Sequence, residues 1–118
     1  MIYMLNAFSL NMLPNDMEAS LKYVPITKSE VRKTLLINGD YVCAIGHNDI
    51  ANILSNMLDL NIRYNRQAVS LREGDIAIVA QYTGPRLQEG TTSLPQNATI
   101  RFCRVNVYNV RKTKDSGE

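Results

Sequence analysis

His47 is the single histidine of the chain and the side chain best suited to acid–base chemistry. It follows Gly46 at the end of a short apolar run and directly precedes a stretch with helical spacing. The start of a helix presents free backbone N–H groups and the positive end of the helix dipole, and both attract anions. An imidazole there can donate a proton to a leaving oxygen near neutral pH. A surface histidine, or one that caps the helix, is the alternative interpretation.

A second polar cluster spans residues 81–90, Gln-Tyr-Thr-Gly-Pro-Arg-Leu-Gln-Glu-Gly, and follows an apolar run. Within it, Arg86 can hold a phosphate through its planar guanidinium group. Glu89 can orient a hydroxyl group or that arginine. The alternative is a solvated loop in which Arg86 and Glu89 form an ion pair.

A third cluster, residues 6–13, reads Asn-Ala-Phe-Ser-Leu-Asn-Met-Leu. Asn6, Ser9 and Asn11 can bind phosphates or base edges, or can close a turn on their own backbone. Arg66 precedes an expected strand and can reach a ligand or lie on the surface. Ligands often bind where strands end, so these clusters can converge on one pocket if the strand ends share an edge of the sheet.

Neither a metal nor a cofactor is expected. Cys43 and Cys103 lie in apolar, strand-like runs and are predicted to be buried free thiols. Two cysteines and one histidine cannot supply the four ligands of a familiar zinc site. The net charge of +2 is too weak for a surface that binds duplex DNA, although it permits a small anionic ligand.

The 118 residues, of which 45% are hydrophobic and 20% charged, predict one globular domain over residues 1–111. Residues 112–118 form a polar tail that we expect to be disordered. No stretch approaches the ~20 apolar residues of a membrane-spanning helix, and no targeting signal is present. A cytoplasmic location without a membrane partner is therefore expected.

The expected elements alternate between strands and helices. Apolar runs predict strands at residues 2–7, 21–26 and 41–45. Thr27 and Glu30 match a capping box that opens a helix to about residue 37, and a second helix is expected over residues 49–60. Residues 68–71 and 75–82 predict a hairpin about 72–74, the second strand being central. The last strand, 99–110, has no cleanly polar face, which predicts contact with another subunit.

This order predicts an α/β fold: a single domain with a mixed β-sheet flanked by helices. With these motifs in this order, the chain resembles the viral anti-CRISPR ring nucleases, which degrade the RNA second messenger cyclic tetra-adenylate. The resemblance covers about residues 2–92 and rests on the following segments: Asn6–Leu13, Ile45-Gly46-His47, Asn65-Arg66, Gln81 and Arg86-Leu87-Gln88-Glu89-Gly90.

The resemblance implies a homodimer that binds cyclic tetra-adenylate across its twofold axis. It implies His47 as the general acid, with Arg86 and Glu89 beside it. It further implies a ligand pocket formed by these residues: Asn6, Ser9, Asn11, Arg66 and Gln81. A ribose 2′-OH would attack the adjacent phosphate without a metal, releasing linear di-adenylates and so silencing type III CRISPR immunity.

Two other functions fit the same sequence. One is a sponge that sequesters the cyclic nucleotide without cutting it. The other is a small regulatory or scaffold protein that uses the strand at 99–110 as an interaction edge.

Overall fold

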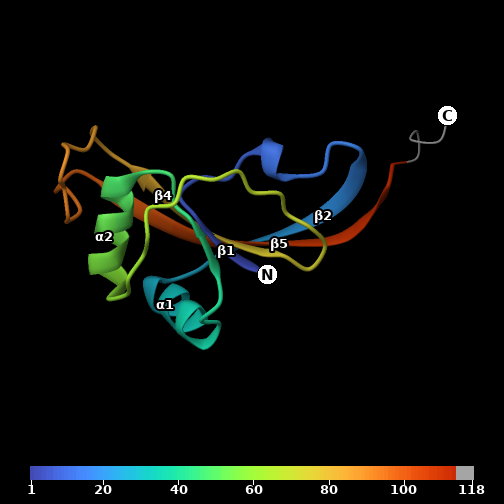
Figure 1. Cartoon of the computed structure of the whole chain (residues 1–118), viewed down its shortest axis with the longest axis horizontal. Coiled ribbons are helices and arrows are strands. Elements are labelled where there is room, and N and C mark those ends of the chain that lie inside the picture. The colour runs from blue at the N-terminus through green and yellow to red at the C-terminus, as the bar shows by residue number, and fades with distance from the viewer. Residues whose placement is uncertain (114–118) are drawn as a thin grey trace.

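The protein, described here over residues 1–113 by a computed structural model, is built on one five-stranded sheet of order β2-β5-β4-β1-β3 (Figure 1). Strand β1 runs parallel to β3 and β4, whereas β5 runs antiparallel to β4 and β2. The predicted mixed sheet with helices is confirmed. The elements are β1 (Ile2–Leu5), η1 (Leu10–Met12), β2 (Met17–Pro25), α1 (Lys28–Ile37), β3 (Val42–Ala44), α2 (Asn48–Leu58), β4 (Ile76–Thr83) and β5 (Thr99–Lys112).

Both helices lie on the same side of the sheet (Figure 1). Helix α1 begins with the predicted capping box, because Thr27 Oγ1 accepts from the Glu30 N–H and Glu30 Oε1 accepts from the Thr27 N–H. Helix α2 ends where Asp59 adopts a left-handed conformation with φ 54°. The two helices bury apolar side chains against Met4 and Ile78 of the sheet: Val31, Leu35, Ile50, Leu54 and Leu58. This layer holds the start of α2 against the sheet.

The opposite face of the sheet is covered in part by the short η1 helix and by loop segments. Around η1, residues 8–13 lie over this face, and the connection from α2 to β4 runs beside them (Figure 1). Val69 and Leu71 of that connection are buried, and the Leu71 N–H donates to the Met12 carbonyl at 2.7 Å. Part of the face beyond these segments stays uncovered, toward β2 and the end of β5.

The predicted hairpin at 68–82 is wrong. Its turn exists, since the Asp75 N–H donates to the Arg72 carbonyl at 3.0 Å and Gly74 has φ 88°. However, residues 68–71 form no strand. The reason is that both edges of β4 are already occupied, by β1 on one side and β5 on the other. The central position predicted for the strand at 75–82, which is β4, is confirmed. Because β4 is central, residues 68–71 have no free edge of it to pair with.

The last strand is predicted to end at residue 110, and only the alternative of a regulatory or scaffold protein uses it as an interaction edge. Instead β5 is internal, hydrogen-bonded to β2 and β4, so its edge is unavailable to a partner. The free edges of the sheet belong to β2 and β3. Of the predicted tail, Lys112 ends β5, and residues 114–118 lie outside the described residues. No helix within residues 1–113 is long and apolar enough to cross a membrane.

Candidate functional site

The carboxyl ends of the parallel strands β1, β3 and β4 share one edge of the sheet, and a cavity of about 340 Å³ opens there. Four of the predicted site residues line it: Asn6, His47, Gln81 and Arg86. They come from the end of β1, the start of α2, the end of β4 and the loop that follows β4. The tertiary structure therefore brings these four together. This cavity is called the His47 cavity below.

Asn6 connects two of the segments that form the cavity. Its Oδ1 accepts a hydrogen bond from the Gly46 N–H at 2.9 Å, which ties the end of β1 to the turn before α2. Arg66 lies against the same turn, because a Cβ built on Gly46 would be 3.5 Å from Arg66 Cγ and 3.9 Å from Asn6 Oδ1. Arg66 is thus next to the cavity although it is not among the residues that line it.

His47 is the N-cap of α2, and its exposed imidazole has one nitrogen committed to the helix. The Ile50 N–H donates to His47 Nδ1 at 3.4 Å. When Nδ1 accepts this bond, the ring proton of a neutral imidazole is on Nε2. The capping interpretation of His47 is therefore confirmed, and in this state Nε2–H is left to donate a hydrogen bond to a ligand.

The loop from Gly84 to Ala98 carries Arg86 and Glu89. Its start is closely packed, since a Cβ on Gly84 would be 2.6 Å from the Ala98 Cβ, and the Tyr82 hydroxyl donates to the Pro85 carbonyl. Arg86 lines the His47 cavity, whereas Glu89 does not. The alternative of an Arg86–Glu89 ion pair is wrong, because neither forms an ion pair within residues 1–113.

Asp49 supports the site from outside the cavity, and sequence reasoning missed it. It lies in the first turn of α2, is 8% exposed, and its Oδ1 accepts from the Gly90 N–H at 3.1 Å. The bond ties the Arg86–Glu89 loop to the helix that begins at His47. The available signal was an acidic residue in a first helical turn, where the helix dipole favours it. The lining residues that sequence reasoning did not assign to the site are Ala7, Ile50, Tyr82, Gly84, Pro85 and Leu87.

Ser9 and Asn11 are not among the lining residues. Ser9 precedes η1 without a side-chain capping bond, Asn11 lies within η1, and both side chains are exposed. Gln81, in contrast, faces two spaces. It lines the His47 cavity and also a groove of about 280 Å³ on the uncovered sheet face, together with Phe8, Tyr23, Val79, Arg101, Phe102, Cys103 and Val105. This groove is called the Tyr23 groove below.

The charge around the His47 cavity suits an anion. Arg86 and the titratable His47 line it, and no Asp or Glu does. Among residues 1–113, no three His, Cys, Asp or Glu side chains are close enough to hold a metal ion. Both cysteines are free thiols, but they are only partly buried rather than fully buried as predicted. Burial still raises the pKa of the Cys103 thiol, while Arg101 opposes that rise.

The fold and the site define a class of single α/β domain with a five-stranded mixed sheet and a cation-lined opening at the ends of its parallel strands. The chain belongs to the STIV B116-like family of archaeal viral proteins, whose model matches residues 2–98. Its fold is similar to that of B116 of Sulfolobus turreted icosahedral virus, with a TM-score of 0.71, 25% identity, and coverage of 89% of this chain and 97% of that chain.

Relatives from filamentous viruses share much of the chain. "Uncharacterized protein 26" of Sulfolobus islandicus filamentous virus is 33% identical over 93 residues, with coverage of 76% of this chain and 74% of that protein. "Uncharacterized protein ORF116" of Acidianus filamentous virus 1 is 29% identical over 111 residues, with coverage of 92% of this chain and 93% of that protein.

Proposed function

We propose that this protein is a metal-independent ring nuclease that cleaves cyclic tetra-adenylate and thereby antagonises type III CRISPR immunity. The observation that carries the proposal is the convergence of Asn6, His47, Gln81 and Arg86 on one cavity that no carboxylate lines. The sequence motifs that resemble the ring nucleases are the ones that contribute these residues. Membership of a viral protein family agrees with a role against host defence.

RNA carries its own nucleophile, so the chemistry needs little more than positioning and proton transfer. The ribose 2′-OH gives its proton to solvent water as its oxygen attacks the adjacent phosphorus. The bond from phosphorus to the 5′-oxygen then breaks, and that oxygen takes a proton from the protein. The products are linear adenylates that end in a 2′,3′-cyclic phosphate. The protein must align the attacking and leaving oxygens and stabilise the developing negative charge.

In this mechanism His47 protonates the departing 5′-oxygen from Nε2. That transfer requires the imidazolium form of His47, with a proton on each ring nitrogen. Nδ1 therefore accepts from the Ile50 N–H only in the resting neutral ring, and this bond is given up when the ring takes its second proton. General-acid assistance of this kind contributes about 10²–10⁴ in rate. The free N–H groups at the start of α2 add a positive potential beside the phosphate.

Arg86 stabilises the charge on the phosphate, because it lines the cavity and has no ion-pair partner within residues 1–113. Glu89 neither lines the cavity nor pairs with Arg86 in this structure, so its proposed role, to orient Arg86 or the attacking hydroxyl group, applies once the ring is bound. Asn6, Arg66 and Gln81 bind the ring from the sheet edge. Ser9 and Asn11 do not line the His47 cavity. In the proposed dimer they contact the ring across the subunit interface.

The homodimer is proposed to form through the Tyr23 groove. Tyr23 and Leu21 of β2 pair with Val105 and Val107 of β5, so they share the sheet face that the helices do not cover. They are 54% and 41% exposed, a large exposure for apolar side chains. Because Gln81 lines both the groove and the His47 cavity, a second copy seated here would bring two cavities together. A twofold pair suits a ring of four identical nucleotides.

The deciding experiment incubates the protein with cyclic tetra-adenylate in EDTA and separates the products, with His47→Asn as the matched variant. Asparagine can still cap α2, so this substitution removes the acid and spares the helix. We expect linear di-adenylates from the parent and a rate lower by about 10²–10⁴ in His47→Asn. Loss of turnover in EDTA would contradict the metal-free mechanism. An intact ring that binds tightly would identify the sponge instead.

A further inference from the structure

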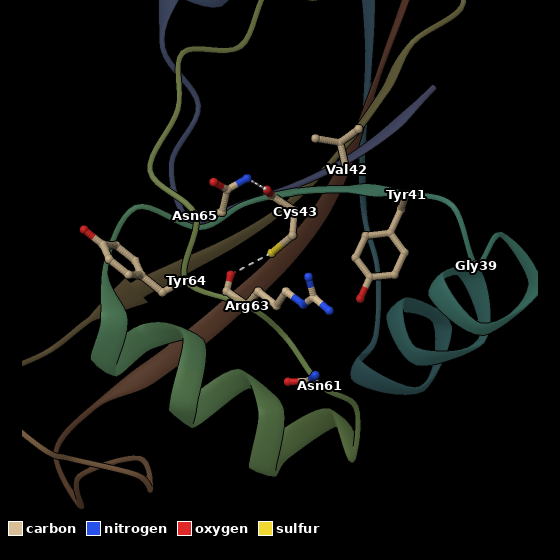
Figure 2. Close-up of a pocket in the computed structure, with 8 residues that line it drawn as sticks. All are labelled: Gly39, Tyr41, Val42, Cys43, Asn61, Arg63, Tyr64 and Asn65. Carbon is tan, nitrogen blue, oxygen red and sulfur yellow. Dashed lines mark hydrogen bonds between the residues drawn. The ribbon is translucent and has the colours of Figure 1, made fainter.

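A second polar pocket, of about 600 Å³, lies at the β3 edge of the sheet (Figure 2). It shares no lining residue with the His47 cavity or the Tyr23 groove. One wall is formed by β3 and the turn that precedes it, and the other wall by the segment that follows α2. The lining residues are Gly39, Tyr41, Val42, Cys43, Asn61, Arg63, Tyr64 and Asn65.

Hydrogen bonds hold the segment of residues 63–65 beside β3. The Asn65 N–H donates to the Ile45 carbonyl at 2.8 Å, and Asn65 Nδ2 donates to the Cys43 carbonyl at 2.8 Å. The Cys43 thiol donates to the Arg63 carbonyl at 3.0 Å (Figure 2). A parallel bridge between Ile45 and Tyr64 completes the connection. The pocket therefore has a wall that the backbone positions before any ligand arrives.

The charge of this pocket favours an anion. Arg63 lines it, no Asp or Glu does, and Arg63 forms no ion pair within residues 1–113. Figure 2 shows the Arg63 guanidinium group and the Tyr41 hydroxyl group extending toward the same space. Burial raises the pKa of Tyr41, Cys43 adds to that rise and Arg63 opposes it, so the phenol remains a neutral hydrogen-bond donor at neutral pH. An arginine with a hydroxyl donor is a suitable pair for a phosphate.

The remaining lining residues suit a nucleobase. Tyr64 lines the pocket and is 51% exposed, and Figure 2 shows its ring pointing away from Arg63, so it offers an aromatic face at the outer rim on which a base can stack. Asn61 and Asn65 supply amide groups for the polar edge of a base, and the Asn65 Oδ1 atom is left over after Nδ2 binds Cys43. The volume falls within the range of roughly 300–1,000 Å³ of pockets that bind small molecules.

We propose that this pocket is a separate nucleotide-binding site, with the phosphate on Arg63 and Tyr41 and the base on Tyr64. The site takes a single nucleotide or the terminal nucleotide of a linear RNA. It stands apart from the cleavage proposal, because it uses none of the residues assigned to that chemistry. The same segment continues to Arg66 beside Gly46, so the two sites are neighbours along one stretch of chain.

The test is a titration of the ¹⁵N-labelled protein with 5′-AMP in EDTA, followed by amide chemical shifts. We expect saturable shifts at residues 41–43 and 61–65 in the parent and equally in His47→Asn. Arg63→Ala and Tyr64→Ala should each weaken the apparent affinity about tenfold. Arg72→Ala removes an exposed arginine from the same connection between α2 and β4 but outside the pocket, and should leave the affinity unchanged.

Three results would overturn the proposal. Shifts confined to the residues around His47 would assign the binding to that cavity alone. An affinity unaffected by Arg63→Ala and Tyr64→Ala would remove the assigned contacts. Inorganic phosphate binding as tightly as 5′-AMP would leave an anion site without a base. Cleavage of cyclic tetra-adenylate is measured separately, so its failure would not affect this outcome.

Discussion

His47 has a structural contact and a free nitrogen at the same time. A helix cap and a general acid require different protonation states of the same ring, because the cap needs an unprotonated Nδ1 and the acid is the imidazolium. Nδ1 accepts from the Ile50 N–H, and Nε2 is the nitrogen left for a ligand. A substitution that removes both functions would confuse a loss of stability with a loss of chemistry, which is why asparagine is the informative replacement.

Asn6 allows ligand binding and local stability to be separated. Asn6→Ala removes the acceptor of the Gly46 N–H and should lower the free energy of unfolding by about 1 kcal/mol. Asn6→Asp keeps an acceptor there but adds a negative charge to a cavity suited to anions. We expect Asp to retain most of the stability and to weaken binding of cyclic tetra-adenylate at least about tenfold. Thermal unfolding and a binding titration check both; equal affinities for Asp and Asn would contradict the anion site.

At the scale of elements, the site depends on how one loop is attached to one helix. The loop of residues 84–98 has no regular structure, and its contacts with α2 determine where Arg86 and Glu89 lie. Asp49 and Asn56 of α2 make those contacts, by accepting from the Gly90 N–H and donating to the Thr92 carbonyl respectively. The loop is therefore held at two turns of the same helix that His47 caps.

Asp49→Ala should release the loop without unfolding the protein. It removes the acceptor of the Gly90 N–H, at a cost of about 1 kcal/mol in unfolding free energy. Hydrogen exchange at the Gly90 amide should become faster, and turnover should fall because Arg86 is less well positioned. Asp49→Asn retains an Oδ1 acceptor and is the control, so slow exchange is expected there. Unchanged exchange in Asp49→Ala would show that the bond does not hold the loop.

At the scale of the whole molecule, the two faces of the sheet differ in how completely they are covered. The helices seal one face, whereas η1 and residues 69–71 cover only part of the other. Tyr23 is left exposed there, and its hydroxyl accepts from Arg101 at 3.2 Å. An apolar side chain fixed on an uncovered face is typical of a surface that meets another protein.

Tyr23→Glu should therefore prevent dimer formation. A carboxylate at the centre of the proposed interface would be desolvated without a partner, which disfavours association strongly. Light scattering should give about twice the 13.3 kDa chain mass for the parent and the chain mass for the variant. Tyr108→Glu alters an exposed tyrosine on the other face of β5 and should stay dimeric. A monomeric parent would contradict the interface outright.

Local sequence signals predicted most of the elements because their causes are local. The Thr27–Glu30 capping box, the spacing of Ile50, Leu54 and Leu58, and the apolar run of β4 act within a few residues of chain. The predicted hairpin at 68–82 is wrong because its turn signal at 72–74 is local, whereas the competition between strands for the edges of β4 is not encoded near it in the sequence. Which strand occupies an edge depends on residues far apart in the sequence, here β1 and β5.

The sequence by itself determined which side chains can do chemistry: a single histidine before a helix, an Arg-Leu-Gln-Glu-Gly segment and polar residues after strands. The tertiary structure decided which of them meet. The parallel pairing of β1 with β3 and β4 places the carboxyl ends of all three at one edge, and this gathers Asn6, His47, Gln81 and Arg86. The same pairing leaves β3 at the border of the sheet, where a pocket forms that no motif indicated. The sequence determines the residue types, but the distances between side chains depend on the order of the strands. Burial of apolar surface on both faces of the sheet determines that order.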